Sequence, residues 1–234
     1  VRILIMIIDN SFWFGIILLY TMALGGIPLY SLECYHGTSS MAAEHILEGN
    51  CFLPSKSDDS LRLGVGVYFF VKCSEANLAK KCAKAFCLNK LRKETSQGKD
   101  YAVIKCLVTC ADDQMLDLFN PECLEAFHTM RYATYSKLCE AEPNFQYRDA
   151  NQADTMVIDK LRSISNIAVV QCPQYFGLLS LEEQIKVGGR HPYKKTNVPN
   201  VIMVCADPTK AIIRDIQLVE RGTLYNDEFS SIIR

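Results

Sequence analysis

The hydrophobic pattern after residue 28 changes several times between strand-like and helix-like spacing. Short apolar runs rich in β-branched and aromatic residues predict strands, because such side chains pack well on a pleated surface, and the run over 65–71 predicts a buried one. These runs predict strands over 29–35, 65–71, 101–109, 167–171, 198–206 and 211–219.

Apolar residues at helical spacing, together with capping residues, predict helices between these strands. Ser39 or Ser40 is suited to cap the first helix, which Gly49 and Asn50 would end. Pro121 stands at a predicted helix start, where a backbone N–H has no helical partner in any case. The predicted helices cover 41–48, about 74–92, a segment that begins at 120–122, and about 154–164. Because they cluster between the early and the late strands, the pattern predicts an α+β fold.

The first 28 residues differ from the rest, since residues 10–32 carry no charge and residues 12–24 are almost wholly apolar. This run is shorter than the roughly 20 residues of a membrane-spanning helix and is closer to the apolar part of a signal peptide. It predicts a signal or an anchor, with membrane association through 12–24. The alternatives are a buried helix and a start-site artefact, because translation from Met22 would leave the run out. We therefore expect a hydrophobic segment over 1–28, one domain over 29–234, and a cytoplasmic or membrane-associated protein.

Composition narrows the possible functions only slightly. With 234 residues, 49% of them apolar, the chain can build one core without metal or disulfide support. Its net charge of −1 gives no basic field of the kind that nucleic-acid-binding domains carry. The 11 cysteines contain no CxxC pair, and with 4 histidines no zinc-ligand pattern emerges. The sequence thus predicts buried, reduced thiols and no metal site.

Two short motifs combine glycines with a histidine or a tyrosine at predicted strand ends: Tyr-His-Gly-Thr at 35–38 and Leu-Gly-Val-Gly-Val-Tyr-Phe at 63–69. Glycine lets a backbone approach a ligand closely, and the two rings offer hydrogen bonds and stacking. With the helix AAEHILEGN between them, the motifs resemble the NAD-binding half of ADP-ribosyltransferases of the poly(ADP-ribose) polymerase type. The resemblance is sharpest over 34–87 and weaker to about residue 216. It implies an ADP-ribosyltransferase-like fold with a split antiparallel sheet flanked by helices.

The resemblance also implies which residues would hold NAD+, as a co-substrate and without a metal. His36 would hydrogen-bond the adenosine ribose, and Gly37 would bring its peptide group to the nicotinamide carboxamide. Tyr68 would stack on nicotinamide, while Gly64 and Gly66 would let its strand pass near the ligand. The other implied ligand-binding residues are Thr38, which would support the turn, Ser74, which would bond the carboxamide, and Arg62, which would meet the pyrophosphate.

Each of these residues also has a purely structural interpretation. His36 would then be a satisfied histidine at a strand end, Tyr68 a core aromatic, and Gly64 and Gly66 parts of a hairpin or bulge. The combination of both motifs in this order, rather than any single residue, favours the functional interpretation.

The sequence departs from the family pattern at two places. The helix after the second motif reads Ala-Asn-Leu-Ala-Lys-Lys-Cys over 76–82 and lacks the second aromatic ring that would close around nicotinamide. The catalytic carboxylate is the other departure. Ile202 stands where polymerising members of the family have a glutamate. The resemblance implies that many mono-ADP-ribosylating relatives, and also inactive ones, have an isoleucine at this position. Glu228 is the alternative candidate, in a sequence Tyr-Asn-Asp-Glu-Phe at 225–229.

The predicted function is transfer of one ADP-ribose from NAD+ to a macromolecular acceptor with release of nicotinamide. The acceptor would be a protein or, in second place, a nucleic acid. The main alternative is a pseudoenzyme that binds NAD or ADP-ribose without turnover, which both departures favour. Two others stay open: a transferase acting on RNA 2′-phosphates, supported only by the basic loop 186–195, and a membrane-anchored interaction protein with coincidental motifs.

Overall fold

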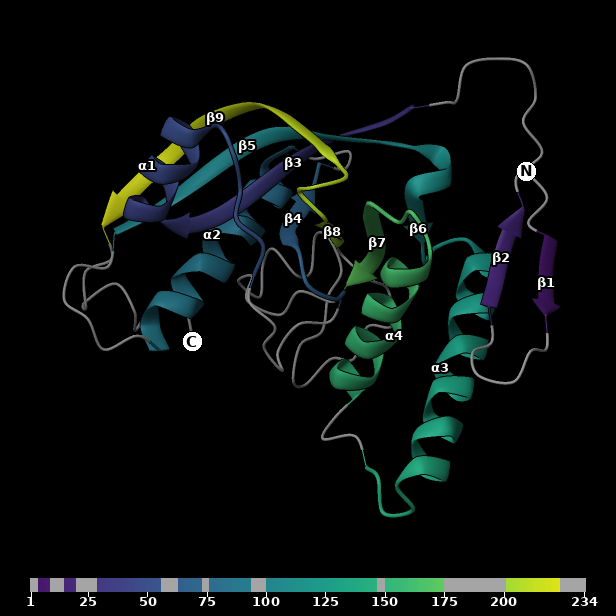
Figure 1. Cartoon of the computed structure of the whole chain (residues 1–234). Coiled ribbons are helices and arrows are strands. Elements are labelled where there is room, and N and C mark those ends of the chain that lie inside the picture. Colours follow the sequence, from purple (N-terminus) through teal and green to yellow (C-terminus); the bar gives the residue numbers. More distant parts are fainter. Residues whose placement is uncertain are drawn as a thin grey trace.

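The computed structural model describes residues 4–8, 15–19, 29–55, 63–72, 76–93, 100–146, 150–174 and 201–223. Within these ranges the chain is a mixed α+β structure with four α-helices, a 7-stranded sheet and a separate 2-stranded sheet (Figure 1). The large sheet contains β3 (Leu29–Ser39), β4 (Val67–Val71), β5 (Asp100–Ala111), β6 (Met115–Asp117), β7 (Val169–Gln174), β8 (Val201–Ala206) and β9 (Ile212–Thr223). The helices are α1 (Ser40–Gly49), α2 (Ala76–Lys93), α3 (Pro121–Ala141) and α4 (Ala150–Ile164).

The strand order of the large sheet is β6-β7-β8-β4-β3-β5-β9. All neighbours are antiparallel except β6 and β7, which are parallel. The longest continuous register joins β3 to β5, from Leu29 opposite Ala111 to Ser39 opposite Tyr101. Because side chains alternate along a strand, β3 turns His36 to one face of the sheet and Gly37 to the other.

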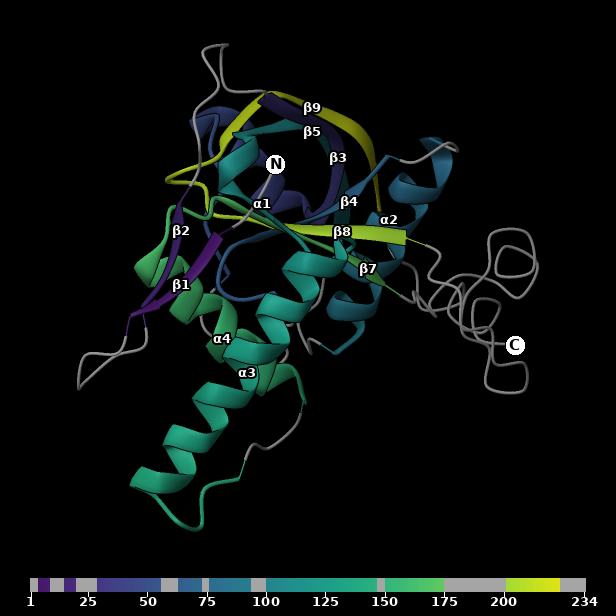
Figure 2. The same ribbon diagram turned by 90° about the vertical axis from the view of Figure 1, so that its right-hand side faces the viewer.

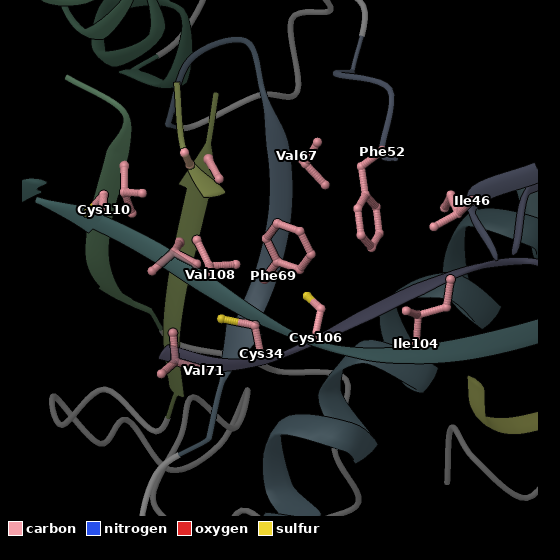
Figure 3. Packing of buried hydrophobic residues seen from close by; sticks show 14 of the residues in the cluster. Cys34, Ile46, Phe52, Val67, Phe69, Val71, Ile104, Cys106, Val108 and Cys110 are labelled. Atoms are coloured by element: carbon pink, nitrogen blue, oxygen red, sulfur yellow. The ribbon is translucent and has the colours of Figure 1, made fainter. Parts of the chain in front are cut away.

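One face of the sheet is covered by α1. The helix begins where Ser39 Oγ accepts a hydrogen bond from Ala42 N–H, and it ends at Asn50, which is left-handed with φ 47°. These caps confirm the start and the end predicted from the sequence. Ala43 and Ile46 of α1 are buried on this face, in a cluster that we call the α1-side core (Figure 3). Its other buried members include Cys34, Phe52, Val67, Phe69, Val71, Ala102, Ile104, Cys106, Val108, Cys110 and Val204.

The opposite face is covered by α2 and α4, one at each end (Figure 2). The helix α2 supplies the α2-side core, whose buried members are Tyr35, Phe70, Leu78, Ala79, Cys82, Ala83, Cys87, Leu88, Leu91, Tyr101, Val103 and Val201. The helix α4 supplies the α4-side core, formed by Leu63, Leu118, Phe127, Met130, Val157, Ile158, Leu161, Ile167, Val170 and Cys205. The central strands of the sheet are therefore buried on both faces, whereas the edge strand β9 is largely exposed or half-buried.

The helix α3 packs against α4 and extends away from the sheet (Figures 1 and 2). Asn120 caps it by accepting hydrogen bonds from the N–H groups of Glu122 and Cys123, and Pro121 is its first residue, as predicted. Phe127 and Met130 are its buried residues.

The strand β9 forms one edge of the sheet and pairs only with β5 among the described strands. Its register shifts twice against β5, and each shift adds one residue on β9. At the second shift Asp215 has a φ of 54°, so the strand is locally bent.

The structure differs from the sequence-based expectations at three points. The large sheet is mixed rather than wholly antiparallel, because β6 runs parallel to β7. The short strand β6 was not predicted from the sequence. In the apolar N-terminal segment, the described parts are two antiparallel strands, β1 (Leu4–Ile8) and β2 (Gly15–Leu19), so the expectation of a buried helix there is wrong for 15–19. The isoleucine-rich composition of both segments favours extended backbone.

Length and apolar character decide whether a helix can span a membrane. None of the described helices combines the length and the apolar character needed to cross a bilayer.

Candidate functional site

The two sequence motifs meet where β3 and β4 separate. His36, Gly37 and Thr38 lie near the end of β3, Gly66 directly precedes β4, and Tyr68 lies within β4. The predicted ligand-binding residues Arg62 and Ser74, and the alternative catalytic residue Glu228, lie outside the described residues.

Pairing between β3 and β4 is short. Cys34 lies opposite Val71 and Tyr35 opposite Phe70, and the register goes no further. Before it, Lys72 N–H donates to Glu33 carbonyl oxygen over 2.8 Å. Antiparallel ladders bond every second residue, so the peptide groups of residues 33, 35 and 37 all face β4. We call the point where pairing stops, formed by His36, Gly37 and Tyr68, the β3–β4 fork.

His36 bridges the fork with its side chain. Its Nδ1 lies 2.8 Å from the carbonyl oxygen of Tyr68 and donates the hydrogen bond, because a carbonyl can only accept. In the neutral ring the other nitrogen, Nε2, is therefore an acceptor. The same carbonyl would have accepted from Gly37 N–H if the ladder had continued by one more pair.

Two phenylalanines hold the His36 ring in place. Its centroid lies 5.4 Å from that of Phe52, in an edge-to-face contact, and 5.6 Å from that of Phe69. Burial lowers the pKa of His36, the Tyr68 carbonyl opposes this shift, and the positive charge of Lys90 adds to it. The lowered pKa favours the neutral ring, in which Nε2 carries no proton while Nδ1 donates.

Gly37 is closely covered on its α-carbon side by α2. A Cβ added there would lie 1.9 Å from the carbonyl oxygen of Ala83 and 3.0 Å from Cys87 Cβ. The absence of a side chain at Gly37 therefore lets a helix pack on the strand. The Gly37 N–H faces β4 and is not paired to Tyr68 in the register of the described strands.

The side chains of His36 and Tyr68 lie on opposite faces of the sheet. The His36 ring contacts Phe69 and Phe52 of the α1-side core, whereas Tyr68 packs against the α4-side core. The Tyr68 hydroxyl accepts from Leu63 N–H over 2.9 Å and donates to Gly64 carbonyl oxygen over 2.8 Å. Burial raises the pKa of this phenol well above its ordinary value. The two predicted ligand-binding side chains are brought together only through the backbone of Tyr68.

The glycines of the second motif are in contact with protein as well. Gly64 has a φ of 77°, and a Cβ there would lie 2.6 Å from Asp159 Oδ1. At Gly66 a Cβ would lie 2.6 Å from Cys205 Sγ and 2.7 Å from the carbonyl oxygen of Ala206. These positions require glycine because α4 and β8 pack against them.

Sequence reasoning missed the two residues of α4 that hold this loop. Asp159 accepts a hydrogen bond from Val65 N–H over 2.9 Å. Arg162 donates to the carbonyl oxygens of Val65 and, over 2.8 Å, of Cys205. Both residues are more than ninety positions from the loop in sequence, and no local signal joins them to it.

At the position where the family has a catalytic carboxylate, this chain has an isoleucine, and the residues around it are apolar as well. Ile202 lies on β8 and packs against the α1-side core, the cluster to which Phe69 beside His36 belongs. Ile202 and His36 thus lie on the same face of the sheet. An isoleucine carries neither charge nor proton, so it supplies no acid–base or electrostatic catalysis there.

The cysteines and acidic residues form neither a disulfide nor a metal site among the described residues. The ten described cysteines are all free thiols, and six of them are buried. Among the described residues no group of three or more histidines, cysteines or carboxylates is placed to hold a metal ion. Comparison with known proteins identifies no matching family model and no matching curated protein.

Proposed function

We propose that residues 29–234 form an ADP-ribosyltransferase-like domain that binds NAD+ at the β3–β4 fork and transfers one ADP-ribose to a macromolecular acceptor. The observation that carries this proposal is the Gly37 N–H, which the register of β3 and β4 leaves out of the ladder. A carboxamide oxygen is an acceptor that suits such a peptide N–H. The neutral His36 ring beside it offers Nε2 as an acceptor for a ribose hydroxyl.

In this proposal the chain contributes binding more than acid–base chemistry. The glycosidic bond between nicotinamide and C1′ of its ribose breaks, nicotinamide leaves with the electron pair, and an acceptor nucleophile bonds to C1′ and loses its proton to solvent. Tyr68 contributes its carbonyl oxygen to the fork, while its phenol remains bonded to the glycine loop. The acceptor itself is proposed to be a protein, with nucleic acid in second place.

The alternative is a protein that holds NAD+ or ADP-ribose without turnover. The aliphatic surroundings of Ile202 favour it, because an oxocarbenium-like transition state gains little from a side chain without charge. Binding and turnover must therefore be measured separately.

Calorimetric titration with NAD+, up to millimolar ligand, tests the binding step. The unmodified protein is expected to bind, and His36→Ala is expected to weaken binding at least tenfold. His45→Ala is the matched control, since His45 is an exposed histidine of the neighbouring helix α1. The absence of NAD+ binding by the unmodified protein at millimolar ligand would contradict the proposal.

Release of nicotinamide, measured by chromatography with and without candidate acceptor proteins, tests the second step. Release from the unmodified protein supports a transferase. Binding without any release supports the non-catalytic alternative.

A further inference from the structure

The two nitrogens of His36 face different partners. Nδ1 donates to the carbonyl oxygen of Tyr68, whereas Nε2 forms no hydrogen bond with the residues that the structure describes. The bond from Nδ1 reaches the carbonyl oxygen that would accept from Gly37 N–H if the β3–β4 register, which ends at Tyr35 and Phe70, continued by one more bonded pair. The imidazole thus supplies a donor to this oxygen at a position where the register of the described strands has no β3–β4 pair.

A donor from His36 reduces the drive for the β3–β4 fork to close, because the Tyr68 carbonyl is already hydrogen-bonded. A partly buried carbonyl left without a donor is unfavourable, and the donor that the register places nearest to Tyr68 is Gly37 N–H. We expect one more pair to form without the imidazole, and that pair would use the Gly37 N–H within the sheet. Phe52 and Phe69 hold the ring in the orientation that prevents this.

We propose that His36 is a positioning residue for the carboxamide of the ligand: its Nδ1 holds the fork open and so keeps Gly37 N–H accessible to a carboxamide oxygen. Nε2 has the separate task of accepting from a hydroxyl group of the same ligand. This inference rests on the proposed function for the identity of the ligand, but the role of Nδ1 in the sheet is independent of it.

Two substitutions of nearly equal shape separate the tasks. Asparagine and leucine both branch at Cγ, but in His36→Asn an amide nitrogen can stand close to the position of Nδ1, whereas His36→Leu has no donor. Neither variant has a counterpart of Nε2. The pair therefore differs in the ability to bond the Tyr68 carbonyl.

Hydrogen exchange of the Gly37 amide, measured by NMR without ligand, tests the fork directly. We expect rapid exchange in the unmodified protein and in His36→Asn, and at least tenfold slower exchange in His36→Leu, where the N–H joins the ladder. If the Gly37 amide exchanges at the same rate in His36→Asn and His36→Leu, and both variants keep the fold, the role assigned to Nδ1 is wrong. The amide of Val65, bonded to Asp159, serves as an internal reference for the fold.

Titration with nicotinamide alone and with ADP-ribose alone tests the link to the ligand. Nicotinamide affinity is expected to stay within about threefold in His36→Asn and to fall at least tenfold in His36→Leu. ADP-ribose affinity is expected to fall in both, because both lack Nε2. Equal loss of nicotinamide affinity in the two variants would overturn the inference. If the unmodified protein binds neither probe, the proposed function fails, and the exchange of Gly37 still decides the role of His36.

Discussion

At the scale of single residues, Gly64 shows how the second motif is constrained by packing. Its φ of 77° lies in the left-handed region, and the space where a side chain would point is filled by Asp159 and Ile158. The conformation sets the direction of the loop, so that Val65 N–H reaches Asp159. Backbone conformation and packing thus both require glycine here.

We expect Gly64→Ala to lower the free energy of unfolding by about 2–4 kcal/mol, from backbone strain combined with overpacking. Urea denaturation measures the change. Gly49→Ala is the matched control, because the nearest atom to its added Cβ is Cys51 Sγ at 3.3 Å and the site ends a helix. That variant is expected to keep or gain up to about 1 kcal/mol. Similar losses in both variants would contradict the explanation.

At the scale of elements, α2 is joined to the edge strand β9 by one carboxylate. Glu220 of β9 accepts from Lys84 over 2.7 Å, pairs with Lys80 over 2.9 Å, and accepts from the Tyr101 hydroxyl over 3.0 Å. Burial alone would raise the pKa of Glu220, but the hydrogen bonds from Lys84, Lys80 and Tyr101 outweigh it and lower the pKa to about 2. The carboxylate thus connects two lysines of the helix with β5 and β9.

The lowered pKa gives Glu220 a stabilising effect that depends on pH. Its full contribution is present above the unfolded-state pKa of about 4.5 and is lost as the pH falls toward about 2. Allowing for partial exposure, we expect Glu220→Gln to lose about 1–2 kcal/mol at pH 7 and the difference from the unmodified protein to shrink below pH 4.5. Denaturation at several pH values measures it.

Glu44→Gln provides the control for this prediction. Glu44 of α1 forms an ion pair with Arg221, which lies on β9 next to Glu220, but both side chains are largely exposed. The free energy of unfolding is therefore expected to change by no more than about 0.5 kcal/mol. A loss in Glu220→Gln that does not change between pH 7 and pH 3 would show that charge is not its cause.

At the scale of the whole molecule, buried cysteines mark all three cores. Cys34, Cys106 and Cys110 belong to the α1-side core, Cys82 and Cys87 to the α2-side core, and Cys205 to the α4-side core. Burial raises the pKa of Cys106 to about 12 and, with nearby aspartates adding to it, that of Cys110 to about 11. Such thiols react only when their core opens.

We expect the six buried cysteines to be alkylated together as denaturant is raised, because the three cores share the strands of one sheet. Exposed Cys51 is expected to react in the native state and serves as the control. Pulsed alkylation followed by mass spectrometry resolves the sites. Labelling of Cys205 at a lower denaturant concentration than Cys34 would show instead that the α4 side opens on its own.

Local signals account for what the sequence predicted well. Helix ends could be predicted because a capping residue acts on backbone groups only a few positions away. This holds for Ser39, Asn50 and Asn120. The strand β6 could not, because three residues gain their partner from β7, more than fifty positions later.

The candidate site was predicted in part for the same reason. The motifs placed His36 and Tyr68 on strands that do become neighbours, but the face of each side chain depends on register, which no local pattern determines. Asp159 and Arg162 hold the glycine loop from a helix far along the chain, and only the folded structure brings them there.

The two extra residues of β9 also determine how the outer edge of the described sheet meets other polypeptides. An exposed edge offers unpaired peptide groups to any extended segment. The stretches of β9 that keep a constant register with β5 are short: 212–214, 217–218 and 220–223. A regular strand added there would lose its alignment within a few residues, even though Ile212 and Leu218 are exposed. The bends in β9 therefore protect the sheet against growth by aggregation.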